Sequence, residues 1–183
     1  MWRITMNKEM TLSQDRLKIL LNYDPETGIF TWRVSGGKAK SGAIAGKVRA
    51  DGYRGIGIRN KQYMAHRLAF LYMHGFIPKI VDHINRDGLD NRWENLRSAT
   101  HAENMRNSKI KSNNSTGAKG VYWNKQRKKY RVLIWANGKR TSFGSWDDPE
   151  AAELVASLVR EKYHGDFHNH GIKSAMRVEK ERS

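Results

Sequence analysis

The stretch Val81–Asn107, VDHINRDGLDNRWENLRSATHAENMRN, decides the fold that we expect of this chain. It places an Asp–His pair, Asp82 and His83, ahead of asparagines that include Asn95 and Asn104. Carboxylate and amide oxygens are ligands that a hard divalent cation accepts. A neutral imidazole is suited to take a proton from water near pH 7. The stretch therefore predicts a hydrolytic site that uses a divalent cation and a histidine base.

The local pattern of this stretch predicts a ββα unit. Thr100 and Glu103 form a capping-box signature, which predicts that a helix starts there and carries Asn104. We expect this helix to face the strand that holds Asp82. The segments before the helix are a strand at 79–82, a polar loop at 85–92 and a second strand at 95–99.

The charge balance indicates a polyanionic partner. The 183 residues include 34 Lys and Arg against 18 Asp and Glu, a formal net charge of +16. The excess positive charges repel one another in the folded chain, and they favour nucleic acid, a polyanion, as the partner. The chain has no cysteine, which excludes disulfides, thiolate zinc sites and cysteine nucleophiles.

No segment indicates a membrane partner. No apolar run approaches the roughly 18 residues of a membrane span. The first ten residues, MWRITMNKEM, lack the apolar core of a secretory signal. We therefore expect a cytoplasmic protein that does not bind membranes.

The segment before residue 79 predicts small elements joined by turns. Residues 35–46 are rich in Gly, Ala and Lys and are expected to form a loop. The histidines His66 and His74 are interpreted as core or surface residues. The expected elements are a helix at 12–21 capped by Thr11 and Gln14, a turn at 24–28, strands at 29–32, 53–58 and 62–65, and a helix at 66–74 that stops at Gly75.

The second half predicts a separate small domain. Residues 108–117 are polar and aperiodic and are interpreted as a flexible linker. Asn137–Gly138 is a strong hairpin signal. Asp148 and Pro149 start a helix with an apolar stripe. The strands expected at 120–124, 130–136 and 139–146 would form an antiparallel sheet that this helix covers on one face; residues 169–183 form a flexible tail.

Other interpretations exist for several polar residues. Residues 83–94 nearly match a calcium-binding loop, but His83 stands where Asp is required, so that reading is rejected. Asn91 and Asn95 can be turn or capping residues, and only the joint spacing favours a role for Asn95. Of the tryptophans, Trp123 and Trp146 are expected in the core.

The motif spacing resembles the HNH nuclease family, in the branch whose last residue is Asn. Asn95 follows His83 by twelve positions and Asn104 follows it by twenty-one. The resemblance implies a ββα-metal fold, with His83 as the general base and Asp82 and Asn104 as ligands of Mg²⁺ or Mn²⁺. It implies Asn95 as a brace for the loop that orients His83. It also implies a homing endonuclease of phage or intron type, acting in the cytoplasm of a phage-infected or bacterial host cell. The flanking positions that agree are Tyr63, His66–Arg67, Gly75, Pro78, Asp90–Asn91–Arg92, Asn95–Leu96–Arg97 and Thr100.

The segment 119–167 resembles an Apetala2-type (ethylene-response) DNA-binding domain. That family lays its three-stranded sheet in the major groove and packs its helix behind. This chain has fewer arginines on the matching strands, so base specificity is not carried over, and we expect phosphate contacts to dominate. The expected sheet-face residues are Tyr122, Asn124, Arg131, Trp135 and Arg140, and the expected phosphate contacts are Arg127, Lys128, Lys129 and Lys139, with further DNA contacts from Arg67, Arg97 and Arg106.

The sequence thus predicts a two-domain α+β endonuclease that cuts double-stranded DNA. The expected parts are an HNH domain at 1–107, a linker at 108–117, an Apetala2-like domain with three antiparallel strands and one helix at 118–168, and a tail. A monomer or weak dimer without a small-molecule cofactor is expected, and one active site per chain cuts one strand. The alternative is a non-catalytic, sequence-specific DNA-binding regulator with a vestigial nuclease fold, against which the intact Asp82, His83 and Asn104 argue.

Overall fold

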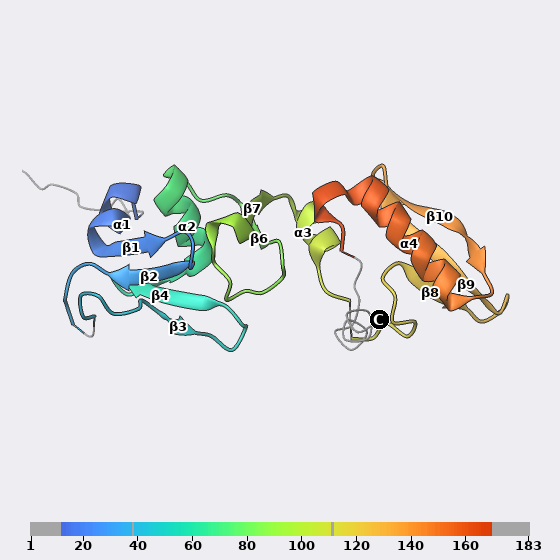
Figure 1. Cartoon of the computed structure of the whole chain (residues 1–183), viewed down its shortest axis with the longest axis horizontal. Coiled ribbons are helices and arrows are strands. Elements are labelled where there is room, and N and C mark those ends of the chain that lie inside the picture. The colour runs from blue at the N-terminus through green and yellow to red at the C-terminus, as the bar shows by residue number, and fades with distance from the viewer. Residues whose placement is uncertain (1–11, 38, 111, 170–183) are drawn as a thin grey trace, which may run out of the picture. The chain divides into compact units, whose positions relative to one another are not determined.

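A computed structural model describes residues 12–37, 39–110 and 112–169 of the chain (Figure 1). The chain divides into two compact units, Met1–Ala99 and Thr100–Ser183. Both units combine helices with antiparallel strands, which confirms the predicted α+β class.

The first unit begins with a helix that leads directly into a hairpin. Helix α1 (Gln14–Leu20) is capped by the Ser13 side chain, which accepts a hydrogen bond from the Arg16 amide. Strands β1 (Leu21–Asp24) and β2 (Ile29–Trp32) then pair in antiparallel register. The predicted helix, 12–21, is therefore three residues too long: it starts two residues later than expected, after the Ser13 cap, and ends one residue earlier, because Leu21 opens a strand that the leucine spacing concealed. The predicted cap Thr11 lies outside the described residues.

A second sheet and a longer helix follow. Strands β3 (Lys47–Val48), β4 (Arg54–Ile58) and β5 (Lys61–Met64) are ordered β3-β4-β5, and the β4–β5 turn holds Arg59 and Asn60 at positive φ. Helix α2 (Ala65–His74) ends at Gly75, whose left-handed φ of 79° favours glycine. The predicted hairpin, helix and glycine stop are confirmed.

The core of the first unit positions the last strand pair. Leu17, Phe30, Ile56 and Leu68 are fully buried and come from α1, β2, β4 and α2. Burying each such side chain contributes roughly 1.5–3 kcal/mol. Leu96 joins the same core. It opens β7 (Leu96–Ala99), which pairs antiparallel with β6 (Ile80–His83) after the short 3₁₀ helix η1 (Trp93–Asn95).

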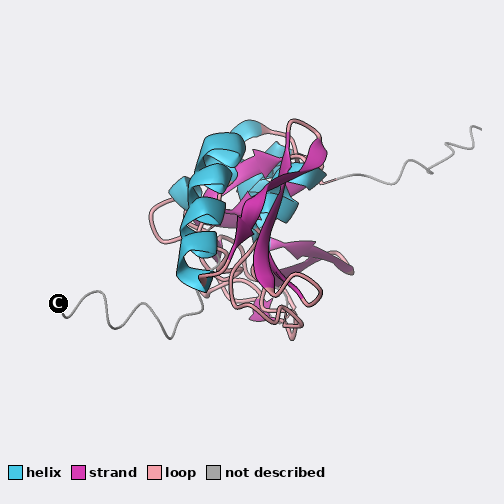
Figure 2. Ribbon diagram, turned by 90° about the vertical axis from the view of Figure 1, so that its right-hand side faces the viewer, coloured by secondary structure: helices cyan, strands magenta, loops and turns pink. Residues whose placement is uncertain are grey.

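The second unit is a three-stranded sheet covered by one long helix. Strands β8 (Val121–Asn124), β9 (Lys129–Ala136) and β10 (Lys139–Trp146) are ordered β10-β9-β8. Helix α4 (Pro149–His164) packs along one face (Figure 2), where Val132, Ile134, Ala152 and Ala156 form the core. This is the predicted sheet-and-helix arrangement. The 3₁₀ helix η2 (Gly165–Phe167) follows α4.

Trp123 departs from its predicted core position. It is 43% exposed and tilts against Tyr130, with 4.7 Å between ring centroids. It lies near the end of the edge strand β8, whereas Val121 at the start of the same strand is buried in the core. Trp146 packs against the core of the second unit, as expected.

Helix α3 (His101–Asn107) belongs to the second unit, although the predicted boundary placed it in the first. Lys119 Nζ donates to the carbonyls of Arg106 (2.6 Å) and Ser108 (2.7 Å). Asn169 Nδ2 donates to the Asn107 carbonyl at 2.8 Å. Helix α3 is thus bonded to Lys119, which precedes the sheet in the sequence, and to Asn169, which follows α4.

Part of the segment predicted as a flexible linker is a hydrogen-bonded turn. Asn114 Oδ1 accepts from the amides of Thr116 and Gly117, and Thr116 Oγ1 donates to the Val121 carbonyl at 2.9 Å. Side chains that bond their own backbone in this way fix a turn. Lys111 and residues 170–183, which include most of the predicted tail, lie outside the described residues.

Candidate functional site

The candidate site is built on the end of β6. Asp82 is 6% exposed and His83 is 5% exposed. Successive strand residues point to opposite faces, so the two side chains enter different environments. Asp82 is paired with Arg97 of β7 and His83 with Leu96. The strand pair thus offers a carboxylate on one side and an imidazole on the other.

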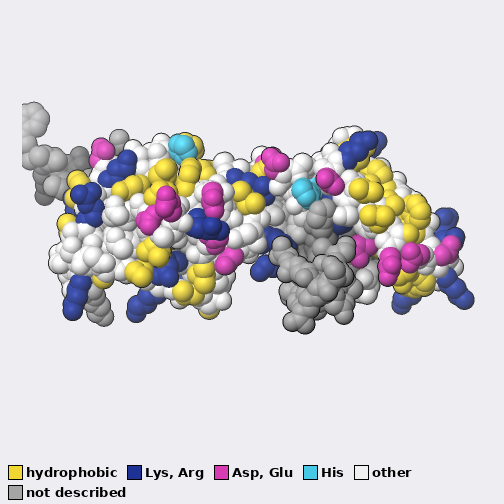
Figure 3. Space-filling model, in the orientation of Figure 1, with side chains coloured by type: hydrophobic (Ala, Val, Ile, Leu, Met, Phe, Trp, Pro, Cys, Tyr) yellow, Lys and Arg dark blue, Asp and Glu magenta, His cyan; other side chains and the backbone are white. Residues whose placement is uncertain are grey.

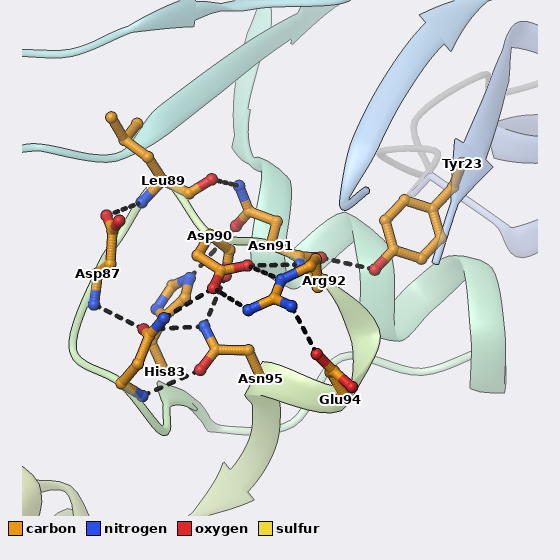
Figure 4. A network of polar contacts seen from close by, with 10 residues as sticks. Tyr23, His83, Asp87, Leu89, Asp90, Asn91, Arg92, Glu94 and Asn95 are labelled. Carbon is orange, nitrogen blue, oxygen red and sulfur yellow. Dashed lines mark hydrogen bonds and ion pairs between the residues drawn. The ribbon is translucent and has the colours of Figure 1, made fainter. Parts of the chain in front are cut away.

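Asn91 holds the imidazole of His83 (Figure 4). Its Oδ1 lies 3.2 Å from His83 Nε2, and its Nδ2 donates to the Leu89 carbonyl at 3.0 Å. Asn91 is only 1% exposed. From the sequence, Asn91 can be a turn residue and is also one of the flanking positions that agree with the motif, but neither reading predicted its contact with His83.

Asn95 closes the loop that follows β6. Its Oδ1 accepts from the Asn85 amide at 2.9 Å, and its Nδ2 donates to Asn85 Oδ1 (3.0 Å) and to the Asp90 carbonyl (2.7 Å). Ile84 N also donates to the Asn95 carbonyl at 2.9 Å. Asn95 therefore joins the start and the end of the loop, which is the geometry that a brace requires.

The same loop carries an ion-pair cluster on its outer side. Arg92 binds Asp90 through Nε (2.9 Å) and Nη2 (2.8 Å), and its Nη1 binds Glu94 at 2.7 Å. The hydrogen bonds from Arg92 lower the pKa of Asp90 to about 2. Asp90 is thus ionised, and the Arg92 guanidinium that binds it offsets its negative charge.

Two aromatic rings enclose His83. The centroid of His66 lies 5.0 Å from that of His83, and Tyr53 lies 5.8 Å from it. Burial lowers the pKa of His83 below its ordinary value, although Asn91 and nearby carboxylates act against the shift. Burial also lowers the pKa of His66 to about 3. Both imidazoles are therefore neutral at pH 7, the state in which a histidine accepts a proton.

Arg97, one of the predicted DNA contacts, binds a carboxylate of its own unit. Its Nε donates to Asp82 Oδ2 at 2.8 Å, and its side chain is 15% exposed. The β6–β7 register places the two side chains opposite each other, and a buried carboxylate needs such a partner. The sequence did not predict this ion pair.

The four candidate catalytic and metal-binding residues divide between the compact units. Asp82, His83 and Asn95 lie in the first unit, and Asn104 lies on α3 in the second. The capping box predicted at Thr100 and Glu103 is confirmed, so Asn104 is helical. Its pairing with Asp82 as a metal ligand stays a prediction. Among the residues that the structure describes, no three His, Asp or Glu side chains form a cluster that could hold a metal ion.

The structure brings four predicted DNA contacts onto one face of the second sheet. Tyr122 pairs with Arg131, and Trp135 pairs with Arg140, all on the face away from α4. Arg140 lies over the Tyr122 ring, 4.9 Å from its centroid. Trp135 is 59% exposed. Aromatic and guanidinium groups thus stand together on an uncovered surface.

Other predicted contacts on the second unit are placed differently. Lys139 pairs with Ala136, so it extends on the helix side of the sheet. Lys129 forms an ion pair with Asp147 at 3.0 Å. Asn124 Oδ1 accepts from the amides of Gln126 and Arg127, which makes it a turn residue. Arg127 and Lys128 are exposed in this turn.

The two remaining arginines lie on helices. Arg67 of α2 donates from Nη1 to the Lys79 carbonyl at 3.3 Å, and Arg106 of α3 is partly exposed. Helix α4 exposes two leucines, Leu154 (61% exposed) and Leu158 (56% exposed), beside charged positions of the same helix. Figure 3 shows hydrophobic side chains at the surface over this helix. No helix in the described part of the chain is both long and apolar enough to span a bilayer.

The chain is similar to one protein family, to a phage protein and to a solved structure. The family model described as HNH endonuclease matches residues 63–106. Protein 3.8 of Escherichia phage T7 is 38% identical over 98 residues, which cover 51% of this chain and 78% of that protein. A structure titled DNA binding and cleavage by the HNH homing endonuclease I-HmuI aligns with a TM-score of 0.38 and 21% identity, covering 83% of this chain and 88% of the other.

Proposed function

Because the chain belongs to the HNH endonuclease family, we propose that it hydrolyses phosphodiester bonds of double-stranded DNA with a histidine base and one divalent metal ion. The observation that carries the proposal is the buried pair Asp82–His83, in which a dedicated side chain, Asn91, holds the imidazole. A buried imidazole needs a hydrogen-bond partner whatever its role; what supports a base is that this partner presents an amide oxygen, which orients the ring, next to the Asp82 carboxylate of the motif.

In this mechanism His83 removes a proton from water. The water O–H bond breaks as the proton moves to the imidazole, and the hydroxyl oxygen bonds to phosphorus. The P–O bond to the leaving oxygen breaks in the same displacement, and that oxygen takes a proton from solvent. Asn95 holds the loop in place while the ring acts, through its bonds to Asn85 and Asp90.

The metal ion follows from the family, and the donor atoms of this chain suit it. Mg²⁺ and Mn²⁺ accept few protein oxygens and complete their shell with water and substrate phosphate. Asp82 offers a carboxylate, and by motif spacing Asn104 is the proposed second ligand. When bound, such an ion neutralises phosphate charge and stabilises the leaving oxygen.

We further propose that the second unit anchors the enzyme to duplex DNA, as its resemblance to Apetala2-type domains implies. The support is the uncovered sheet face with Tyr122, Arg131, Trp135 and Arg140. Arginine and aromatic side chains suit contacts to phosphates and bases. A homing-type role in the cytoplasm of a phage-infected or bacterial cell is part of the same proposal, and the relative in phage T7 supports it.

A plasmid assay tests the proposed reaction. Supercoiled plasmid is incubated with the protein and Mg²⁺ or Mn²⁺, with and without EDTA. We expect conversion to nicked circles that EDTA and His83→Ala abolish, whereas the control His74→Ala, at an exposed histidine of the same unit, retains activity. Plasmid that stays supercoiled with every metal, while still bound by the protein, would favour the second candidate, a DNA-binding regulator. Its supporting observation is that Arg97 already binds the Asp82 carboxylate.

A further inference from the structure

Asn91 links the first hairpin of the chain to His83. Its side chain bonds to the imidazole, and its main-chain carbonyl accepts a hydrogen bond of 2.7 Å from the hydroxyl of Tyr23. Tyr23 lies on β1 and is 4% exposed. The three residues thus form a buried chain of contacts that begins outside residues 63–106, the segment that the family model matches (Figure 4).

The orientation of the Asn91 amide decides which nitrogen of His83 carries the proton. The Leu89 carbonyl is an acceptor only, so the side-chain group that faces it at 3.0 Å must be the NH₂. The amide oxygen then faces His83 Nε2, and this oxygen accepts but cannot donate. Nε2 must therefore be protonated, which leaves the lone pair of the neutral imidazole on Nδ1.

The hairpin holds the Asn91 peptide from the other side. A Cβ atom on Gly28 would lie 2.3 Å from the Asn91 carbonyl carbon, so the two backbones are in direct contact. Trp93 N donates to the Pro25 carbonyl at 2.8 Å. Burial raises the pKa of Tyr23 above its ordinary value, so its hydroxyl stays protonated and remains a donor. The turn between β1 and β2 therefore fixes the segment from which the Asn91 side chain projects.

We infer that Asn91 and Tyr23 are positioning residues that hold His83 as the Nε2–H tautomer, so that Nδ1 accepts the proton of the attacking water. Asn91 acts directly on the ring, and Tyr23 acts through the Asn91 main chain. The inference rests on the nuclease function proposed above, because it assigns the nitrogen that performs the proton transfer there.

The tautomer is measurable on the wild-type protein without metal or DNA. In a ¹⁵N-labelled sample near pH 8, long-range ¹H–¹⁵N spectra distinguish protonated from unprotonated ring nitrogens, and the His83→Ala spectrum identifies the His83 signals. We expect His83 Nε2 to be protonated and Nδ1 to be unprotonated. Protonation on Nδ1 overturns the inference, whether or not the protein cleaves DNA.

A matched pair of tyrosine variants tests the role of the hairpin. Tyr23→Phe removes only the hydroxyl that binds the Asn91 carbonyl, and we expect kcat for plasmid nicking to fall about 10- to 100-fold with little change in KM. Tyr72→Phe is the control, because its ring packs edge-on against Tyr23 and Phe30 in the same core. It should retain wild-type kcat.

The outcomes separate this inference from the proposed function. A wild-type kcat in Tyr23→Phe overturns the role of Tyr23, and an equal loss in Tyr72→Phe shows that the effect is general to the core. If Tyr23→Phe does not fold, Asn91→Leu replaces it: kcat falls by a similar factor if Asn91 positions the ring, and is unchanged if it does not. Wild-type protein that never nicks plasmid overturns the function and, with it, the catalytic role assigned to Nδ1.

Discussion

Arg97 and Asp82 lie opposite each other in the β6–β7 ladder, and Nε and Nη2 of Arg97 are each 2.8 Å from the same carboxylate oxygen, Oδ2. Both side chains are largely buried, so the pair is shielded from solvent. A divalent ion at Asp82 would therefore bind beside a fixed guanidinium. Together they would present two positive groups to a phosphate.

Breaking this pair is expected to destabilise the first unit. Arg97→Met removes the guanidinium that binds the buried Asp82 carboxylate, and we expect the free energy of unfolding to fall by about 3–5 kcal/mol in urea titrations. Asp82→Asn added to Arg97→Met should restore part of the loss, because it removes the charge of the buried carboxylate. The control Arg16→Met, on the exposed side of α1, should change stability by no more than about 0.5 kcal/mol. Equal effects of the two arginine variants would show that the pair contributes nothing.

Asn95 should stabilise the loop after β6 more than it stabilises the rest of the unit. Asn95→Ala removes the acceptor of the Asn85 amide and the donor to the Asp90 carbonyl, each a partly buried group. We expect a loss of about 1–3 kcal/mol and faster amide hydrogen exchange at Asn85. Asn22→Ala, at an exposed position of β1, is the control. Unchanged exchange at Asn85 would contradict the bracing geometry.

Stability of the first unit should decrease in acid because of His66. Its folded-state pKa of about 3 lies below the ordinary value of about 6.5, so the unfolded chain binds the extra proton between these values. The contribution of neutral His66 to the free energy of unfolding is complete above about pH 6.5. It decreases as the pH falls toward 3, by up to about 1.4 kcal/mol per pH unit. His66→Phe should flatten this dependence in urea titrations from pH 7 to pH 4. His74→Phe, at the exposed end of the same helix, should keep the wild-type slope.

The pH dependence of cleavage should follow the environment of His83. Burial lowers its pKa, so the fraction of neutral base stays high below the ordinary value of about 6.5. We expect single-turnover cleavage rates to remain near their maximum at that pH and to decline only in more acidic buffer. An acid limb centred above about 6.5 would mean that another group limits the rate.

The sheet face of the second unit should carry much of the affinity for DNA. Arg131→Ala should weaken binding and reduce the slope of log K against log salt by about 1, as expected when one phosphate contact is lost. Trp135→Ala should weaken binding with little change in the salt slope, because it removes no charge. Lys162→Ala, an equal charge change at an exposed position of α4, is the control. Equal effects of Arg131→Ala and Lys162→Ala would contradict a role for the sheet face.

Point variants are preferable to truncation of this chain. A deletion that starts at Ser108 would remove Lys119 and Asn169, whose side chains bind the carbonyls of Arg106 and Asn107. It would therefore disturb α3 together with the sheet. Loss of activity in such a deletion would not separate DNA anchoring from cleavage.

Much of the fold was predictable because its signals are local. Asn137–Gly138 takes positive φ at both positions, as a tight hairpin turn requires, and Asp148 caps α4 through two amides. Gly75 and the Thr100–Glu103 capping box likewise end and begin helices where expected. Each signal acts within a few residues, so the surrounding fold does not alter it.

The features that were missed depend on contacts between distant segments. Asn91 gains its position from Tyr23, 68 residues earlier, and Arg97 gains its partner from the register of two strands. Arg160 of α4 is 1% exposed and bonds to the Lys119 carbonyl, although arginine on a helix usually indicates a solvated face. Composition and periodicity do not specify these pairings, because they follow only from tertiary packing.

The membership of α3 in the second unit has an evolutionary consequence. A recombination event that exchanged the C-terminal unit at its own boundary, after Ala99, would replace Asn104 together with the sheet that we propose binds DNA. An exchange that kept the nuclease motif intact would have to join the two sequences after Asn107. The new C-terminal part would then lack Lys119 and Asn169, which bond to the carbonyls of Arg106 and Asn107, unless it carried equivalent residues. A chain in which only the sheet and α4 were exchanged would thus keep Asn104 but would have to re-form the contacts that hold α3.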